Sequence, residues 1–149
     1  MLEIRPAEWQ DCEIIWKWRN DPVTRKYSFN TKFIPLKEHK AWVKDALKDK
    51  SRKILLIEVD KTPTGVVRFE IDSKNRTAEI NINIAPEQQG KGLGTLTIKE
   101  SCNYGFSHLN IIKVIAKVKK DNTSSTRAFS KAGFRTVQEN EVIIMQLEK

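Results

Sequence analysis

The stretch TAEININIAPEQQGKGLGT, from Thr77 to Thr95, decides the fold of this chain. Its first half alternates strictly between apolar and polar residues, so three isoleucines fall on one face of a predicted strand. Its second half is a turn with three alternate glycines, Gly90, Gly92 and Gly94, and a long helical pattern follows. The stretch therefore predicts a strand joined to a helix through a glycine-rich turn.

Changes between period two and helical period predict the other elements. The patterns predict strands over residues 2–5, 53–59, 66–72, 77–85, 113–118 and 142–147, and helices over residues 9–20, 35–49, 92–108 and 124–132. The aromatic-rich segment 24–34 predicts no regular element. The order β-α-α-β-β-β-α-β-α-β indicates a single α/β (α+β) domain, residues 1–149, with a central, mostly antiparallel sheet flanked by helices.

The composition is that of a folded domain with excess positive charge. Of 149 residues 39% are apolar, and 27 Lys+Arg against 19 Asp+Glu give a net charge of +8. We expect no membrane segment and no secretory signal, because no apolar run is long enough and the first residues lack the basic-then-apolar pattern. The lysines are scattered among acids, so we expect no nucleic-acid partner. Cys12 and Cys102 have no metal-ligand spacing, and we expect buried reduced thiols, no metal and a cytoplasmic protein.

The glycine-rich turn has the properties of a phosphate-binding loop. Glycine lets the backbone approach a ligand closely, and the start of the next helix offers free N–H groups and the positive end of the helix dipole. Together these features suit a pyrophosphate. The spacing G-x-G-x-G differs from the G-x-x-x-x-G-K-[ST] of a P-loop and from the G-x-G-x-x-G of a dinucleotide-binding fold.

Two motifs resemble those of the GNAT N-acetyltransferase superfamily. Gln89-x-x-Gly92-x-Gly94 is similar to the family's Q/R-x-x-G-x-G/A signature for acetyl-coenzyme A (acetyl-CoA), and NTSSTRAFSKAGF, which begins at Asn122, is similar to its N-x-x-[AS]-x-x-x-Y-x-K-x-G-F segment. The opening IRPAEWQD resembles the family's first strand and helix, so the resemblance covers essentially the whole chain. It implies the GNAT fold and acetyl-CoA as the cosubstrate.

The resemblance also implies where acetyl-CoA contacts the chain. Backbone amides of residues 82–85 are expected to hold the thioester carbonyl, where the strand separates from its neighbour. The implied contact residues are Ile82, Ile84, Gln89, Gly90, Lys91, Gly92, Leu93, Gly94, Thr95, Asn122, Ser125 and Phe129. Many relatives carry a tyrosine in place of Phe129, thought to protonate the leaving thiolate, which phenylalanine cannot do. Ser125, Tyr104, water, or departure as an unprotonated thiolate remain open alternatives.

Acetyl transfer requires a neutral amine, although an alkyl amine is mostly protonated near neutral pH. Ala78-Glu79-Ile80 resembles an Ala-Glu-Ile at which some family members carry their general base. We therefore expect Glu79 to take the proton, directly or through one water. The alternative interpretation is a solvent-facing or ion-paired glutamate on a strand.

The N-terminal part resembles a subset of the family. WKWRNDP, from Trp16, and FIPLKEHKAW, from Phe33, are similar to acetyltransferases of nucleotide-linked amino sugars in pseudaminic-acid-type pathways, and also to enzymes that acetylate ribosomal protein N-termini. Basic groups near aromatic rings favour a sugar nucleotide, because they pair a diphosphate and stack a base. We expect acceptor contacts at Arg19, Asn20, Tyr27 and His39.

Two other functions stay open at this point. An acetyltransferase for a protein or peptide amine would favour an acidic or open cleft. A non-catalytic module that binds acyl-CoA is suggested by the loss of the tyrosine at Phe129. A homodimer is open as well, because final strands in such folds often pair across a dimer.

Overall fold

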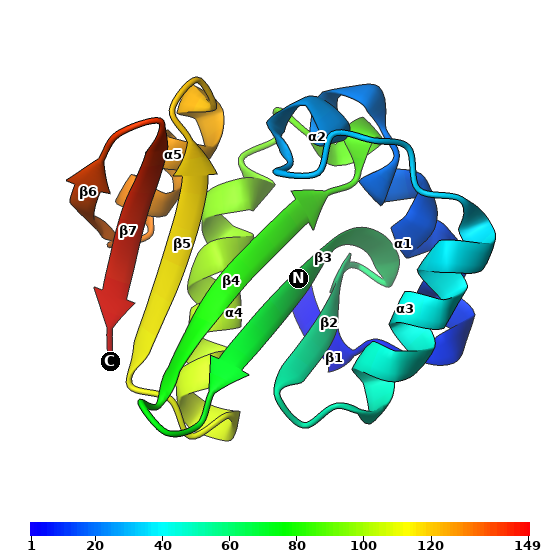
Figure 1. The fold of residues 1–149 in the computed structure, drawn as a ribbon, viewed down its shortest axis with the longest axis horizontal. Coiled ribbons are helices and arrows are strands. Elements are labelled where there is room, and N and C mark those ends of the chain that lie inside the picture. Colours follow the sequence, from blue (N-terminus) through cyan, green and yellow to red (C-terminus); the bar gives the residue numbers. More distant parts are fainter.

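The computed structural model describes all residues, 1–149, and has one seven-stranded sheet (Figure 1). The strands are β1 (Leu2–Pro6), β2 (Arg52–Val59), β3 (Thr62–Asp72), β4 (Thr77–Ile84), β5 (Lys113–Lys119), β6 (Arg135–Glu139) and β7 (Val142–Glu148). The helices are α1 (Cys12–Arg19), α2 (Pro22–Tyr27), α3 (Leu36–Lys48), α4 (Leu93–His108) and α5 (Thr123–Lys131), with short 3-10 turns η1 (Trp9–Asp11) and η2 (Pro86–Gln88). The predicted fold class is confirmed, and the structure adds α2 and β6 to the predicted order.

The strand order is β1-β2-β3-β4-β5-β7-β6, and only β4 and β5 run parallel. A parallel pair needs a crossover connection, which α4 supplies. The chain leaves the end of β4, returns behind the sheet as α4 and re-enters as β5 (Figure 1). This connection places the N-terminus of α4 at the C-terminal ends of the central strands β4 and β5.

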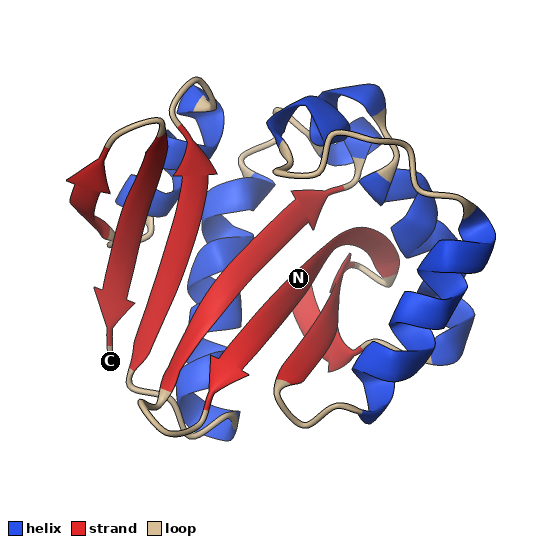
Figure 2. Cartoon of the chain, viewed as in Figure 1, coloured by secondary structure: helices blue, strands red, loops and turns tan.

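Helices flank the sheet (Figure 2), and the sheet carries a separate apolar cluster on each face. The α4 face, covered by α4 and α5, holds a cluster of 17 buried residues that includes Phe69 and Ile80. The α1–α3 face, covered in part by α1 and α3, holds a cluster of 8 that includes Leu56 and Val66. Side chains alternate along a strand, so Glu79 lies on the α1–α3 face because its neighbour Ile80 lies on the α4 face.

Helix α2 begins at the Asp21-Pro22 pair that was interpreted only as the end of the preceding helix. Proline at the first helical position loses no hydrogen bond, because that N–H has no partner inside a helix. The Asp21 carboxylate accepts a hydrogen bond from the backbone N–H of Thr24 at 3.2 Å, which caps the new helix. The same dipeptide therefore ends α1 and starts α2.

Strand β6 lacks the alternation on which the strand predictions rest. All five of its residues, RTVQE, are exposed, because β6 is the outermost strand of the sheet and pairs only with β7. A strand with no buried side shows no period-two pattern in its sequence.

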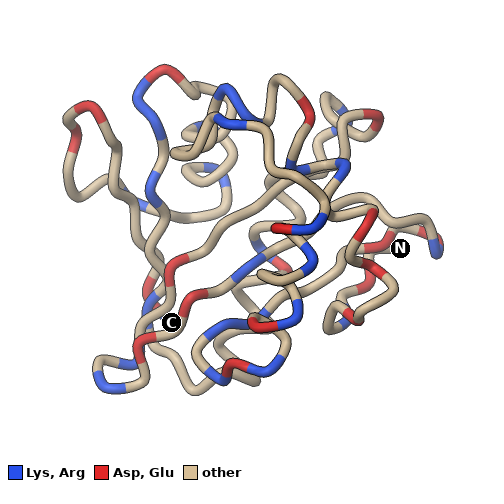
Figure 3. Tube along the Cα trace, turned by 45° about the vertical axis from the view of Figure 1, so that its right-hand side comes forward, with Lys and Arg blue, Asp and Glu red and all other residues tan.

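Lysine and arginine are interspersed with aspartate and glutamate over the whole trace (Figure 3). This distribution agrees with the interpretation of most lysines as solvated surface residues. No helix is both long and apolar enough to span a membrane.

Candidate active site

Strands β4 and β5 separate before they end. Their pairing covers Thr77–Ile80 against Lys113–Ala116 and stops there, and Figure 1 shows the two arrows diverging towards their tips. The backbone N–H of Ala85 donates to the carbonyl of Thr64 at 2.8 Å, on the β3 side. Since successive amides of a strand point to opposite sides, the N–H groups of Ile82 and Ile84 point into the region between β4 and β5. We call this region the splay.

The glycine-rich turn closes the end of the splay. The Gln89 side-chain amide donates to the carbonyl oxygen of Ile84 at 3.1 Å, which ties the turn to the last residue of β4. Gly90 and Gly92 both have φ of 78°, a left-handed conformation that side-chain-bearing residues adopt at a cost. Gly92 is the N-cap of α4 and no side chain caps this helix, so its first N–H groups, from Leu93 onward, are free for a ligand.

The N-terminus of α5 lies beside that of α4. The Asn122 side chain accepts a hydrogen bond from the backbone N–H of Ser125 at 3.2 Å and so caps α5. The helices approach closely at Gly94, where an added Cβ would lie 3.8 Å from the Cβ of Ala128. The predicted cofactor residues of both motifs thus lie near the C-terminal ends of β4 and β5.

Two predicted site side chains are placed in the interior. Phe129 is 3% exposed and contacts Phe134 edge-to-face, with ring centroids 5.0 Å apart. His39 is fully buried, and its Nε2 lies 3.0 Å from the carbonyl oxygen of Cys12. Burial and the charge of Arg19 lower the pKa of His39, and the hydrogen bond to this carbonyl partly opposes them. The predictions that Phe129 contacts acetyl-CoA and that His39 contacts the acceptor are therefore corrected: both rings are core residues.

Asn20 and Tyr27 have different surroundings. The Asn20 amide donates to the carbonyl of Ile34 at 2.9 Å and accepts from the Ile34 N–H at 2.8 Å, so it fixes the loop before α3. Tyr27 is half-buried at the end of α2, with the ammonium of Lys26 5.2 Å from its ring centroid. Lys119, the last residue of β5, donates to the carbonyl of Lys26 at 3.2 Å and ties α2 to the end of the splay.

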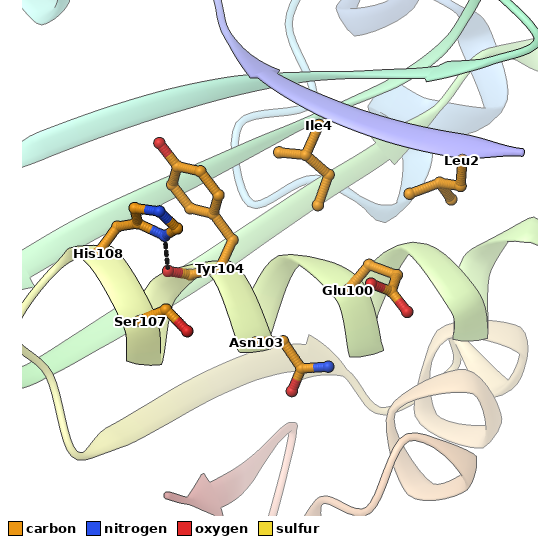
Figure 4. Close-up of a pocket in the computed structure, with 7 residues that line it drawn as sticks. All are labelled: Leu2, Ile4, Glu100, Asn103, Tyr104, Ser107 and His108. Carbon is orange, nitrogen blue, oxygen red and sulfur yellow. Dashed lines mark hydrogen bonds between the residues drawn. The ribbon is translucent and has the colours of Figure 1, made fainter.

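Tyr104 is too far from the splay to serve as the acid considered for the leaving thiolate. It follows Leu93 by about three helical turns, or about 16 Å along α4. Its ring stacks on that of His108 at 4.3 Å, beside a pocket between β1 and α4 (Figure 4). That pocket is lined by Leu2, Ile4, Glu100, Asn103, Tyr104, Ser107 and His108.

Glu79 lies on the α1–α3 face of β4, next to the splay. Its side chain is 39% exposed, and its Oε2 lies 3.4 Å from the Nζ of Lys117 on β5. In the strand register Glu79 faces Glu70 of β3, while Arg68 faces Asn81 two residues further along β4. The carboxylate is thus both ion-paired and open to solvent, as the alternative interpretation describes, and its role as the general base stays a prediction.

Arg68 is a charged residue that the sequence analysis did not select. It lies on β3 between the buried Val67 and Phe69, and its guanidinium carbon lies 5.3 Å from the ring centroid of Trp42 on α3. Arg19, which was selected, has its guanidinium carbon 5.0 Å from the same centroid. A charge in the middle of an otherwise buried strand, VVRF, is the signal that points to Arg68.

Comparison with known proteins places this geometry in a family. Residues 1–135 match the model of the acetyltransferase (GNAT) domain. Spermidine N(1)-acetyltransferase of Escherichia coli K12 is 31% identical over 134 residues, which cover 89% of this chain and 72% of the relative. Acetyltransferase PseH of Campylobacter jejuni is 29% identical over 132 residues, covering 89% and 82%.

A solved structure agrees over the whole fold. Spermidine N-acetyltransferase of Vibrio cholerae, in complex with CoA and spermine, superposes with a TM-score of 0.92 at 26% identity, covering 99% of this chain and 95% of that chain. The fold, the glycine-rich turn at the start of α4 and these similarities agree, and the chain belongs to the GNAT acetyltransferase family as an acetyl-CoA-dependent N-acetyltransferase.

Proposed function

We propose that this enzyme transfers the acetyl group of acetyl-CoA to a primary amine on a nucleotide-linked amino sugar, with Glu79 as the general base. The observation that carries the acceptor class is the positive charge next to Glu79. Arg19 and Arg68 converge on Trp42 there, and Arg68 is the diagonal neighbour of Glu79 across β3 and β4. Cationic groups beside an aromatic ring suit an anionic nucleotide.

The proposed reaction is direct attack on the thioester. Glu79 accepts a proton from the acceptor ammonium, directly or through one water, and the neutral amine attacks the acetyl carbonyl carbon. The N–H groups of Ile82 and Ile84 point into the splay, where they would stabilise the oxyanion that forms. As the C–N bond is made the C–S bond breaks and CoA leaves as a thiolate, and the remaining extra proton of the attacking nitrogen passes to that thiolate through water, which gives the neutral amide and the free thiol. A thiol pKa near 8.5 makes this departure feasible near neutral pH without an acid at Phe129.

The proposed cofactor site lies at the end of the sheet where helices α4 and α5 begin. Leu93, Gly94 and Thr95 offer free amides and the positive end of the α4 dipole to the pyrophosphate of acetyl-CoA. The exposed turn residues Gly90 and Lys91 precede them. Asn122 and Ser125 lie at the start of the neighbouring helix, α5.

A polyamine is the second candidate acceptor. It is favoured by the similarity to the spermidine acetyltransferases and by the carboxylates of Glu70 and Glu79, which face each other across β3 and β4. An ammonium group would pair with such carboxylates. A polycation would, however, meet Arg19, Arg68 and Lys117 on the same face, and like charges in partly buried surroundings repel strongly.

A panel of acceptors tests the proposal. Each amine is incubated with acetyl-CoA and the release of free CoA thiol is measured. We expect kcat/KM for a UDP-linked amino sugar to exceed that for spermidine and for a peptide N-terminus by at least about tenfold. A preference for spermidine would replace the amino sugar with the polyamine, and a preference for the peptide would favour protein acetylation. Turnover of none of these amines would overturn the proposed acceptor class.

A further inference from the structure

Two guanidinium groups on the α1–α3 face converge on one indole. Arg19 comes from the end of α1, Arg68 from the middle of β3 and Trp42 from α3. The guanidinium carbons lie 5.0 and 5.3 Å from the Trp42 ring centroid, within the range of a cation–π interaction. Three separate elements thus hold two like charges against the same ring.

These two charges lack strong partners within the chain. Arg19 forms no side-chain hydrogen bond or ion pair, and the carboxylate of Glu70 lies 3.5 Å from the Nε of Arg68, too poorly aligned for a hydrogen bond. The Arg68 Nε is itself buried without a hydrogen-bond partner. Burial lowers the pKa of both arginines. The charge of Arg68 lowers the pKa of Arg19 further, against the effect of Glu38, whereas Glu70 and Glu79 oppose the effect of burial on Arg68.

Neighbouring groups relieve this repulsion only in part, because the carboxylates of Glu70 and Glu79 act on Arg68 and not on Arg19. The buried His39 packs near Trp42, with ring centroids 6.0 Å apart, and burial and Arg19 lower its pKa, against the effect of its hydrogen bond to Cys12. The arrangement therefore costs folding free energy in the free protein. Such a cost is typical of a site that is completed by a ligand of opposite charge.

We propose that Arg19 and Arg68, held against Trp42, bind a phosphate group of the amine acceptor. This inference rests on the proposed function and adds the residues that select the acceptor. Guanidinium groups match phosphate oxygens in paired hydrogen bonds, and a partly buried site strengthens them. Arg68 and Glu79 are diagonal neighbours on one face, with backbones about 7–8 Å apart. The site thus holds the phosphate of an acceptor beside the carboxylate that takes the proton from its amine.

The phosphate in question could come from the acceptor or from CoA, and one measurement separates the two. Thermal unfolding is followed for the wild type, Arg19→Met and Arg68→Met, each with UDP, inorganic pyrophosphate or CoA. Methionine keeps an unbranched apolar stem against Trp42 and removes the charge. Arg135→Gln is the matched control, because Arg135 lies on β6 at the edge of the sheet.

We expect UDP to raise the melting temperature of the wild type and of Arg135→Gln, and to leave that of Arg19→Met and Arg68→Met unchanged. CoA should stabilise all four proteins equally. The proposal is overturned if neither UDP nor pyrophosphate stabilises the wild type, if the arginine variants respond to UDP like the wild type, or if they lose the response to CoA instead.

Steady-state kinetics separates this inference from the proposed function. With a UDP-linked amino sugar we expect Arg68→Met to raise KM by about tenfold to hundredfold with a smaller change in kcat. An unchanged KM would overturn the phosphate site and leave the acceptor class intact. If no amino sugar is acetylated while UDP still binds in an Arg68-dependent way, the acceptor class fails and the phosphate site stands.

Discussion

The Nζ of Lys117 lies 3.4 Å from the Oε2 of Glu79, across the point at which β4 and β5 stop pairing. The two residues come from parallel neighbouring strands, and both side chains lie on the α1–α3 face. Their ion pair orients the carboxylate on the same strand that carries the inward-pointing amides of Ile82 and Ile84. The base of the proposed function thus lies on the strand whose free amides are proposed to bind the thioester carbonyl.

Replacing Glu79 tests its role as the base. Glu79→Gln keeps the size of the side chain and removes its ability to accept a proton, so we expect kcat to fall by at least about 10²-fold. CoA affinity, measured by calorimetry, should stay unchanged because the carboxylate lies on β4 and not on the glycine-rich turn. Glu3→Gln, an exposed change on β1, is the control and should retain wild-type turnover. Wild-type turnover of Glu79→Gln would remove this residue from the mechanism.

The glycines of the turn differ in what they tolerate. Gly92 has φ of 78°, so alanine there is strained by about 1–2 kcal/mol and shifts the free amides of α4. Gly94 is helical, and an added Cβ would make an ordinary 3.8 Å contact with Ala128. We expect Gly92→Ala to weaken CoA binding at least about tenfold and to lower thermal stability, whereas Gly94→Ala folds at least as stably as the wild type. Equal behaviour of the two variants would contradict the proposed CoA site.

Acid should destabilise the protein through Asp11. Both Asp11 carboxylate oxygens accept from the Arg5 guanidinium, at 2.8 and 2.9 Å. These bonds, opposed by burial and assisted by the Glu8 backbone N–H, lower the pKa of Asp11 below its usual 3.8. A carboxylate with a lowered pKa in the folded state stabilises above the pKa of the unfolded chain, and this contribution is lost as pH falls through the folded pKa.

We therefore expect Asp11→Asn to cost about 1–3 kcal/mol of unfolding free energy at pH 7. The difference from the wild type should shrink as pH is lowered below 4, where the wild-type carboxylate also loses its charge. Urea unfolding at pH 7 and at pH 3 measures both values. Asp45→Asn, at an exposed position of α3, should show no such pH-dependent gap. A constant gap at both pH values would mean that the charge of Asp11 is not the stabilising feature.

The two cysteines should not react in a thiol assay of the folded enzyme. Cys12 and Cys102 are both buried, and burial raises the pKa of Cys102 to about 12. The thiolate is the reactive form, so neither residue should react with Ellman's reagent near neutral pH. Both should react once the protein is unfolded in guanidinium chloride. Rapid labelling of the native protein would show that one thiol is accessible.

Much of the fold could be predicted because its signals are local. The alternation of β4 and the glycines before α4 are properties of a few adjacent residues, and they predicted a strand, a turn and a helix where the structure has them. Helix α2 and β6 were missed for equally local reasons: a proline that both ends and begins helices, and an edge strand with no buried side. The predicted burial of both cysteines is confirmed.

The candidate site also combines features set by adjacent residues with features set by packing between distant elements. The turn from Gln89 to Thr95 could be predicted from sequence because its conformation depends on glycines among adjacent residues, and its contacts with CoA stay a prediction. Whether a side chain faces a ligand depends instead on packing between distant elements. His39 and Phe129 carry plausible chemistry, but α1 and the apolar cluster of the α4 face enclose them.

The amino-acid sequence by itself determined the family, the acetyl-CoA chemistry and the place of the glycine-rich turn, because hydrophobic period and glycine conformation act between near neighbours. Only the tertiary structure brought Lys117 to Glu79, and Arg19 and Arg68 to Trp42. Those contacts depend on strand register and on the packing of α1 and α3 against the sheet, and residues separated by tens of positions carry no local pattern that records them.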